Sequence, residues 1–75
     1  MNSLDDFAQL ISDQIGIPVT SKDLRRGVDE VPGWDSLHVM WLLTLLERET
    51  GRRLSLPQVI EAPTLAHVYE MAVAP

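Results

Sequence analysis

The sequence predicts an all-α fold, a four-helix bundle of three main helices and one short helix. Glycine and proline divide the chain into stretches in which apolar residues recur every three or four positions, the spacing that places them on one face of a helix. No stretch shows the alternation of apolar and polar residues that a half-buried strand requires. Residues that cap helices stand before three of the stretches, namely Ser3, Asp35 and Thr64.

The first helix is expected over residues 3–15. Ser3 is a candidate N-cap, and Asp6, three positions later, forms a weaker relative of the capping box. Gly16 and Pro18 end the helical pattern. The apolar face consists of Leu4, Phe7, Ala8, Leu10, Ile11 and Ile15.

Residues 16–34 show no sustained periodicity and predict a long, ordered loop. Residues 22–26 can form a helical turn within it. Because apolar residues are spread along this loop, we expect it to pack on the core and to join helices that need not be antiparallel neighbours. These residues are Ile17, Val19, Leu24, Val28 and Val31.

A central helix is expected from Asp35–Ser36 to about Thr50. Asp35 is a good N-cap, because its carboxylate can accept hydrogen bonds from the free amides of the first turn. Gly51 follows as a C-terminal signal. Apolar residues cover most of the circumference, which indicates a helix that is contacted from several sides. They are Leu37, Val39, Met40, Trp41, Leu42, Leu43, Leu45 and Leu46.

Two shorter helices are expected in the last third of the chain. Pro57 suits the first turn of a short helix that ends near Ala62–Pro63. Thr64 then caps a last helix. The apolar side of that helix contains Leu65, Val68, Tyr69, Met71 and Ala72.

Length and composition limit the kinds of protein this can be. We expect one small domain over residues 1–75, with little room for the deep pocket of an enzyme. The chain has no cysteine, which excludes disulfides and thiolate metal sites. The net charge of −5 argues against nucleic acid or an anionic membrane as a partner. The start at Met1 suggests a free-standing protein. Since no signal peptide or membrane-spanning stretch is present, a cytoplasmic location is expected.

Metal and catalytic sites are not indicated. His38 and His67 are the only histidines, and neither has the spacing of a metal ligand. Asp35, Ser36 and His38 have the residue types of a catalytic triad, but neighbours at a helix start point in different directions, whereas triads are assembled from separate segments. The sequence therefore predicts a protein that is not an enzyme, with His67 at its surface.

Ser36 follows a Pro-Gly-Trp loop and stands in the first turn of the longest expected helix. Its hydroxyl is expected to be exposed at the positive end of the helix dipole, where the free amides favour a phosphate by typically about 0.3–1 kcal/mol. Position alone also fits an ordinary serine that starts a helix.

The residues around Ser36 resemble the carrier-protein family, the acyl and peptidyl carriers of fatty-acid, polyketide and nonribosomal peptide synthesis. Asp-Ser-Leu alone is a weak signal. Here it follows Gly-Trp, heads a leucine-rich helix and lies midway along an acidic chain of 75 residues, which makes it strong. The resemblance spans residues 3–73. It rests on Gly33, Trp34, Asp35, Ser36, Leu37, Met40, Leu42, Leu43, Leu45, Leu46, Glu47, Gly51, Leu54, Thr64 and Leu65.

This resemblance implies that Ser36 holds a covalent 4′-phosphopantetheine group, transferred from coenzyme A by a phosphopantetheinyl transferase. The thiol of that group would carry acyl or aminoacyl groups as thioesters. Asp35 would cap the helix and flank the site, and Leu37 would pack beside the arm as part of the surface that the transferase recognises. The other implied partners are a loading enzyme (an adenylating ligase or an acyltransferase) and a downstream synthase or transferase. The carrier itself is expected to be a monomer.

Several residues depart from the pattern of fatty-acid carriers, which typically have acids just after Asp-Ser-Leu and along this helix. Here His38 follows Leu37, Trp41 stands where an acid is common, and Arg48 lies between two glutamates. His38, Met40 and Trp41 are therefore candidate partner-binding residues, although Trp41 also fits the core. These departures favour a discrete carrier of polyketide or nonribosomal peptide biosynthesis. A fatty-acid carrier and an unmodified helical interaction module are the alternatives.

Overall fold

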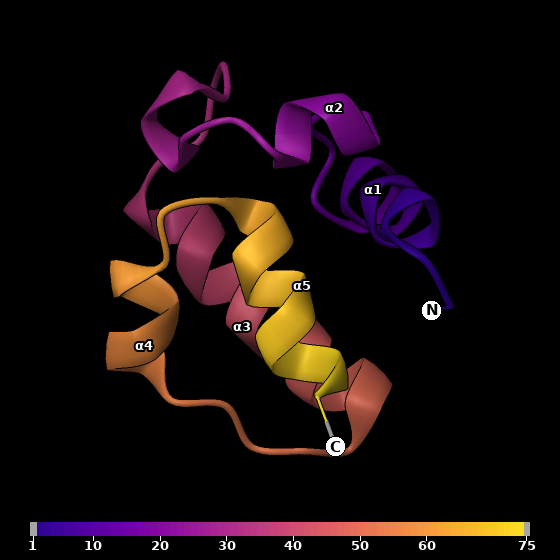
Figure 1. The fold of residues 1–75 in the computed structure, drawn as a ribbon, viewed down its shortest axis with the longest axis vertical. Coiled ribbons are helices and arrows are strands. Elements are labelled where there is room, and N and C mark those ends of the chain that lie inside the picture. The colour runs from indigo at the N-terminus through magenta and orange to yellow at the C-terminus, as the bar shows by residue number, and fades with distance from the viewer. Residues whose placement is uncertain (1, 75) are drawn as a thin grey trace.

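The computed structural model describes residues 2–74 and contains helices and no strand within that range (Figure 1). Its elements are α1 (Leu4–Gln14), α2 (Ser21–Leu24), the 3₁₀ helix η1 (Val28–Glu30), α3 (Ser36–Thr50), α4 (Leu56–Glu61) and α5 (Leu65–Val73). The predicted all-α class is confirmed, with α1, α3 and α5 as the main helices and α4 as the short one. Met1 and Pro75, where the predicted domain begins and ends, lie outside the described residues.

The ends of α1 lie where the sequence predicts them. The Ser3 hydroxyl accepts a hydrogen bond from the Asp6 amide at 3.2 Å, and the Asp6 carboxylate accepts one from the Asn2 amide at 2.9 Å. At the other end Ile15 is the C-cap, and Gly16 follows with φ of 88°, a left-handed conformation that favours glycine.

The connection between α1 and α3 contains more helix than the sequence predicts. The predicted turn at residues 22–26 is the short helix α2, which begins one residue earlier. A full capping box starts it: the Thr20 hydroxyl accepts from the Asp23 amide at 3.4 Å, and the Asp23 carboxylate accepts from the Thr20 amide at 2.9 Å. The turn η1 follows before the chain reaches α3.

This connection is tied to the rest of the molecule at both ends, so it is an ordered loop as predicted. The Ser12 hydroxyl on α1 accepts a hydrogen bond from the Val19 amide at 3.1 Å. Further along, the Val28 amide donates to the Pro63 carbonyl at 3.1 Å. The loop therefore spans the molecule from α1 to the α4–α5 connection.

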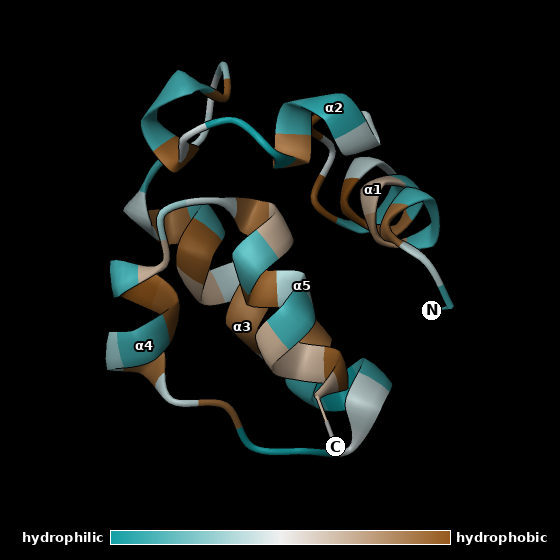
Figure 2. Ribbon diagram, in the orientation of Figure 1, coloured by the Kyte–Doolittle hydropathy of each residue, from teal (hydrophilic) through white to brown (hydrophobic). Residues whose placement is uncertain are grey.

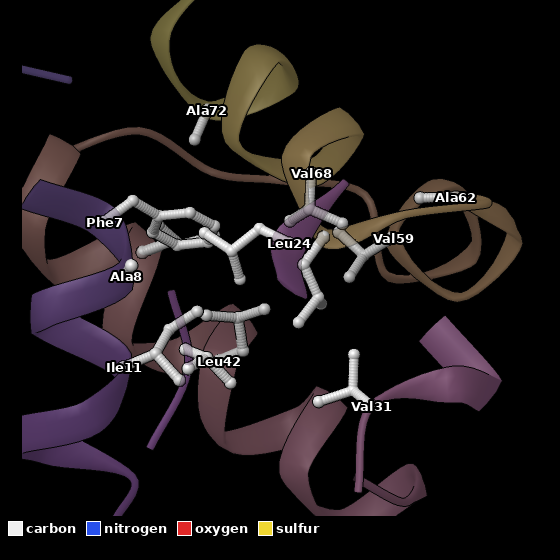
Figure 3. Packing of buried hydrophobic residues seen from close by; sticks show 13 residues of the cluster. Phe7, Ala8, Ile11, Leu24, Val31, Leu42, Val59, Ala62, Val68 and Ala72 are labelled. Carbon is white, nitrogen blue, oxygen red and sulfur yellow. The ribbon is translucent and has the colours of Figure 1, made fainter. Parts of the chain in front are cut away.

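The core forms where α1, α3 and α5 meet, with α5 lying across α3 in Figure 1. Figure 3 shows Phe7 of α1, Leu42 of α3 and Val68 of α5 pointing toward one another, with Leu24 of α2 among them. Each of these four side chains is at most 1% exposed. Their burial supplies the hydrophobic stabilisation of a chain that has no disulfide.

The prediction that α3 is contacted around most of its circumference holds only in part. Leu42 and Leu46 are fully buried, whereas Leu37, Met40 and Trp41 are 53%, 47% and 48% exposed. The helices α4 and α5 contact α3, and these three side chains nevertheless keep about half of their surface exposed. Figure 2 shows the resulting distribution, with hydrophobic residues from the start of α3 onward and hydrophilic residues at its end.

The last third of the chain is held by caps and by two longer links. Thr64 caps α5 by accepting from the His67 amide at 3.0 Å, and Ser55 caps α4. The Glu47 carboxylate, near the end of α3, accepts a hydrogen bond from the amide of Leu54 in the following loop at 2.9 Å. The Arg52 guanidinium donates to the Ala72 carbonyl at 3.2 Å and so joins the end of α3 to the end of α5. No helix among residues 2–74 has the length and apolar character needed to cross a bilayer.

Two leucines on α3 test the division between its buried and exposed sides. Leu42→Ala should lower the free energy of unfolding by about 3 kcal/mol, because it removes a fully buried side chain and leaves a cavity. Leu37→Ala is the matched control on the same helix and should change that free energy by less than about 0.5 kcal/mol. Urea unfolding followed by circular dichroism measures both. Equal losses in the two variants would contradict the assignment.

Candidate functional site

The segment that leads into α3 is turned by a glycine. Gly33 has φ of 78°, a conformation that residues with a Cβ rarely adopt. The Trp34 amide donates to the Val31 carbonyl at 3.2 Å and closes this turn. Asp35 is then extended, with φ of −142°, and Ser36 is the first residue of α3. The turn therefore brings Ser36 to the start of the longest helix.

Asp35 caps α3 through one carboxylate oxygen. Its Oδ1 accepts a hydrogen bond from the His38 backbone amide at 3.1 Å and lies 2.6 Å from the imidazole Nδ1 of the same residue. The backbone amide, followed by the imidazole, stabilises the charged carboxylate and lowers the pKa of Asp35 from its ordinary value of 3.8. The predicted N-cap is confirmed, and His38 adds a second donor.

The Ser36 side chain is exposed, and the side-chain hydrogen bonds that cap α3 join Asp35 to His38 and do not involve the Ser36 hydroxyl. It lies in the first turn of α3, where the backbone amides have no helical acceptor and the helix dipole is positive. An anion attached to this oxygen is favoured by that field. This position is the one that the sequence predicts.

An apolar groove of about 330 Å³ opens beside Ser36. Ser36, Leu37, Val39 and Met40 contribute from α3, and Ile60 contributes from α4. Ile60 is 62% exposed, while its neighbour Val59 is buried in the core. Both are apolar residues of the same short helix. No pattern within so short a segment separates the groove residue from the core residue.

On a different side of α3, three aromatic rings contact one another in a row. The His38 ring lies between two indoles, with centroids 5.5 Å from Trp34 and 5.1 Å from Trp41, the latter edge-to-face. Trp41 is 48% exposed and is not part of the buried core, so its contact with partners stays a prediction. The side chain of His38 is only 18% exposed.

His67 is exposed at the start of α5, as predicted. Within residues 2–74, no three histidine or acidic side chains come together in a way that could hold a metal ion. Asp35, Ser36 and His38 do lie close together, but the His38 imidazole is hydrogen-bonded to Asp35 and not to Ser36.

Comparison with known proteins matches residues 5–72 to the family described as "Phosphopantetheine attachment site". Over 65 residues the chain is 32% identical to a protein named acyl carrier protein from Saccharopolyspora erythraea. That alignment covers 87% of this chain and 68% of the relative. No solved structure matches the chain.

The charge of Asp35 should make the stability of α3 depend on acid pH. Because folding lowers the pKa of this carboxyl, the charged side chain stabilises the protein above the ordinary value of 3.8, and that stabilisation is lost as the pH falls through the lower folded value. Asp35→Asn keeps an oxygen acceptor for the cap but removes the titration. The wild-type melting temperature should therefore fall more steeply below about pH 4 than that of the variant.

The pKa of Asp23 is also lowered, chiefly by the Thr20 amide, so both proteins keep an acid transition from that group. The measurement is consequently the difference between the two melting curves from pH 2 to pH 7. Parallel curves would show that Asp35 does not contribute.

Proposed function

The chain belongs to the family of carrier proteins with a phosphopantetheine attachment site, and on this premise we propose that Ser36 is the residue that holds the group. Acyl carrier proteins are carriers and not catalysts, so the chain is not an enzyme. The cofactor of the family is 4′-phosphopantetheine.

The observation that supports Ser36 best is its free, exposed hydroxyl at the start of α3 and at the edge of the apolar groove. Three of the four other serines use their hydroxyls to stabilise the fold. Ser3 and Ser55 cap α1 and α4, and Ser12 links α1 to the following loop. Modification of any of these would compete with a structural hydrogen bond, whereas modification of Ser36 would not.

The residues around Ser36 fit a phosphate ester that is followed by a flexible, partly apolar arm. The first-turn amides and the dipole of α3 favour the phosphate. Leu37, Met40 and Ile60 offer apolar surface along the groove. In the attachment step the Ser36 oxygen forms a bond to phosphorus, the pyrophosphate of coenzyme A is cleaved, and the adenosine bisphosphate leaves while a base of the transferase takes the hydroxyl proton. When bound, the group supplies a thiol that carries acyl or aminoacyl groups as thioesters.

The exposed side of α3 supports a role in polyketide or nonribosomal peptide biosynthesis. Leu37, Met40 and Trp41 make this side apolar, and Arg48 adds a positive charge. An enzyme with a basic docking surface selects a helix that is rich in acidic side chains, and this side of α3 offers few of them. A fatty-acid carrier is therefore the less favoured alternative. The second alternative is an interaction module that is not modified, since the same exposed apolar side chains could serve docking alone.

The family as a whole interacts with a phosphopantetheinyl transferase and with acyl-handling enzymes. For this chain we propose, more specifically, an adenylating ligase or acyltransferase that loads it and a synthase or transferase that unloads it. We also propose that residues 1–75 form a single carrier domain that acts as a monomer in the cytoplasm. Met40 and Trp41 would contact these enzymes, together with the exposed edge of His38.

Attachment at Ser36 can be tested by intact mass. After incubation with coenzyme A, Mg²⁺ and a phosphopantetheinyl transferase, the wild type should gain one phosphopantetheine and Ser36→Ala should gain none. Ser55→Ala is the control, because it removes another exposed serine at a helix start and should still be modified. A wild type that stays unmodified with several transferases would favour the interaction module. Modification of Ser36→Ala would place the group elsewhere.

A substitution of Trp41 tests whether this side chain contributes to enzyme docking or to the stability of the fold. Trp41→Ala should raise the KM of a partner enzyme for the carrier about fivefold, because exposed tryptophan is a common interface anchor. It should lower the free energy of unfolding by less than about 2 kcal/mol, below the 3–5 kcal/mol or so of a buried tryptophan. Val73→Ala, on α5 and 44% exposed, should leave KM unchanged. An unchanged KM in Trp41→Ala would exclude it as an anchor.

A further inference from the structure

The imidazole of His38 makes more contacts than is usual for a histidine at the start of a surface helix. Its imidazole contacts Trp34 on one side and Trp41 on the other, and its Nδ1 lies 2.6 Å from Asp35 Oδ1. The side chain of Asp35, in contrast, is 62% exposed. A mostly buried ring thus holds an exposed carboxylate directly before Ser36.

The geometry identifies which atom carries the proton. The lowered pKa of Asp35 means that its carboxyl is ionised near neutral pH and can only accept. A contact of 2.6 Å between Nδ1 and this oxygen is a hydrogen bond, so the proton is on Nδ1. This holds whether the ring is neutral or charged, because both states can carry a proton at Nδ1.

Two donors from one residue share the same oxygen. The His38 amide and the His38 imidazole both donate to Asp35 Oδ1. A single hydrogen bond to the amide would let the carboxylate swing about its side-chain torsions, but a second donor from a ring that two indoles hold removes much of that freedom. Oδ1 is therefore committed to the cap, directly before Ser36 in the chain.

We propose that His38 is a positioning residue for the modification of Ser36. Acting through Asp35, it fixes the carboxylate that caps α3 and so holds the Ser36 hydroxyl in one orientation for the transferase. The proposal rests on the proposed attachment of phosphopantetheine at Ser36. It assigns His38 an effect on the chemical step, distinct from the docking contribution of Leu37, Met40 and Trp41.

Three substitutions separate this role from simple packing. Asn carries a side-chain NH₂ at the same bond distance from the backbone as Nδ1, so His38→Asn can restore the donor to Asp35. His38→Gln places its NH₂ one bond further out, and His38→Leu has no donor. Steady-state modification by the transferase should show kcat about tenfold lower for His38→Leu and His38→Gln, with KM within about twofold of the wild type. His38→Asn should recover kcat to within about threefold of the wild type.

The proposal is overturned if His38→Leu is modified with an unchanged kcat, or if His38→Asn is as slow as His38→Gln. If His38→Leu does not fold, the Asn and Gln variants alone decide, because both are polar amides and differ in reach. Failure of the proposed function would look different, since the wild type itself would not be modified.

A second measurement does not depend on modification. The ¹⁵N chemical shifts of the imidazole report which ring nitrogen carries a proton. We expect Nδ1 of His38 to be protonated in the wild type, and in Asp35→Ala we expect the signal to move toward that of a histidine free in solution. An unprotonated Nδ1 in the wild type would overturn the proposal.

Discussion

The fold and the candidate site both depend on the burial of one side of α3. Leu42 and Leu46 are fully buried against the rest of the molecule, and this contact fixes the rotation of the helix about its own axis. Once that rotation is fixed, Leu37, Met40 and Trp41 must point outward, because they lie on the other faces of the same helix. One helix thus provides the centre of the core and an exposed apolar surface, which is how a chain of 75 residues holds both.

The start of α3 then decides where the chemistry can occur. The turn at Gly33 and the cap at Asp35 begin the helix at Ser36 and at no other residue. The groove beside Ser36 is completed from a distant part of the chain, by Ile60 of α4. The proposed attachment residue and its surroundings therefore come from two elements that the core holds in place.

Much of this arrangement follows from local sequence, because caps and helical periodicity act over a few residues. Ser3, Asp35 and Thr64 each predicted a helix start, and the structure has a helix after each. The sequence also contains the residues of the capping box, Thr20 and Asp23. The glycines and prolines around them interrupt the helical periodicity, so the sequence predicts only a helical turn there. Other features could not be predicted, because they depend on how helices pack: the exposure of Ile60 and the insertion of His38 between two indoles are contacts in space.

The bond from Arg52 to Ala72 has a mechanical consequence. It keeps the end of α5 next to the residues that follow α3, at the opposite end of that helix from Ser36 (Figure 1). Fifteen helical residues separate these ends by about 22 Å. A surface, a dye or a second protein joined after Ala74 would thus leave the molecule on the far side from Ser36. Tension applied through such a linkage would act on α5 and on the Arg52 contact, at the end of α3 that is distant from Ser36.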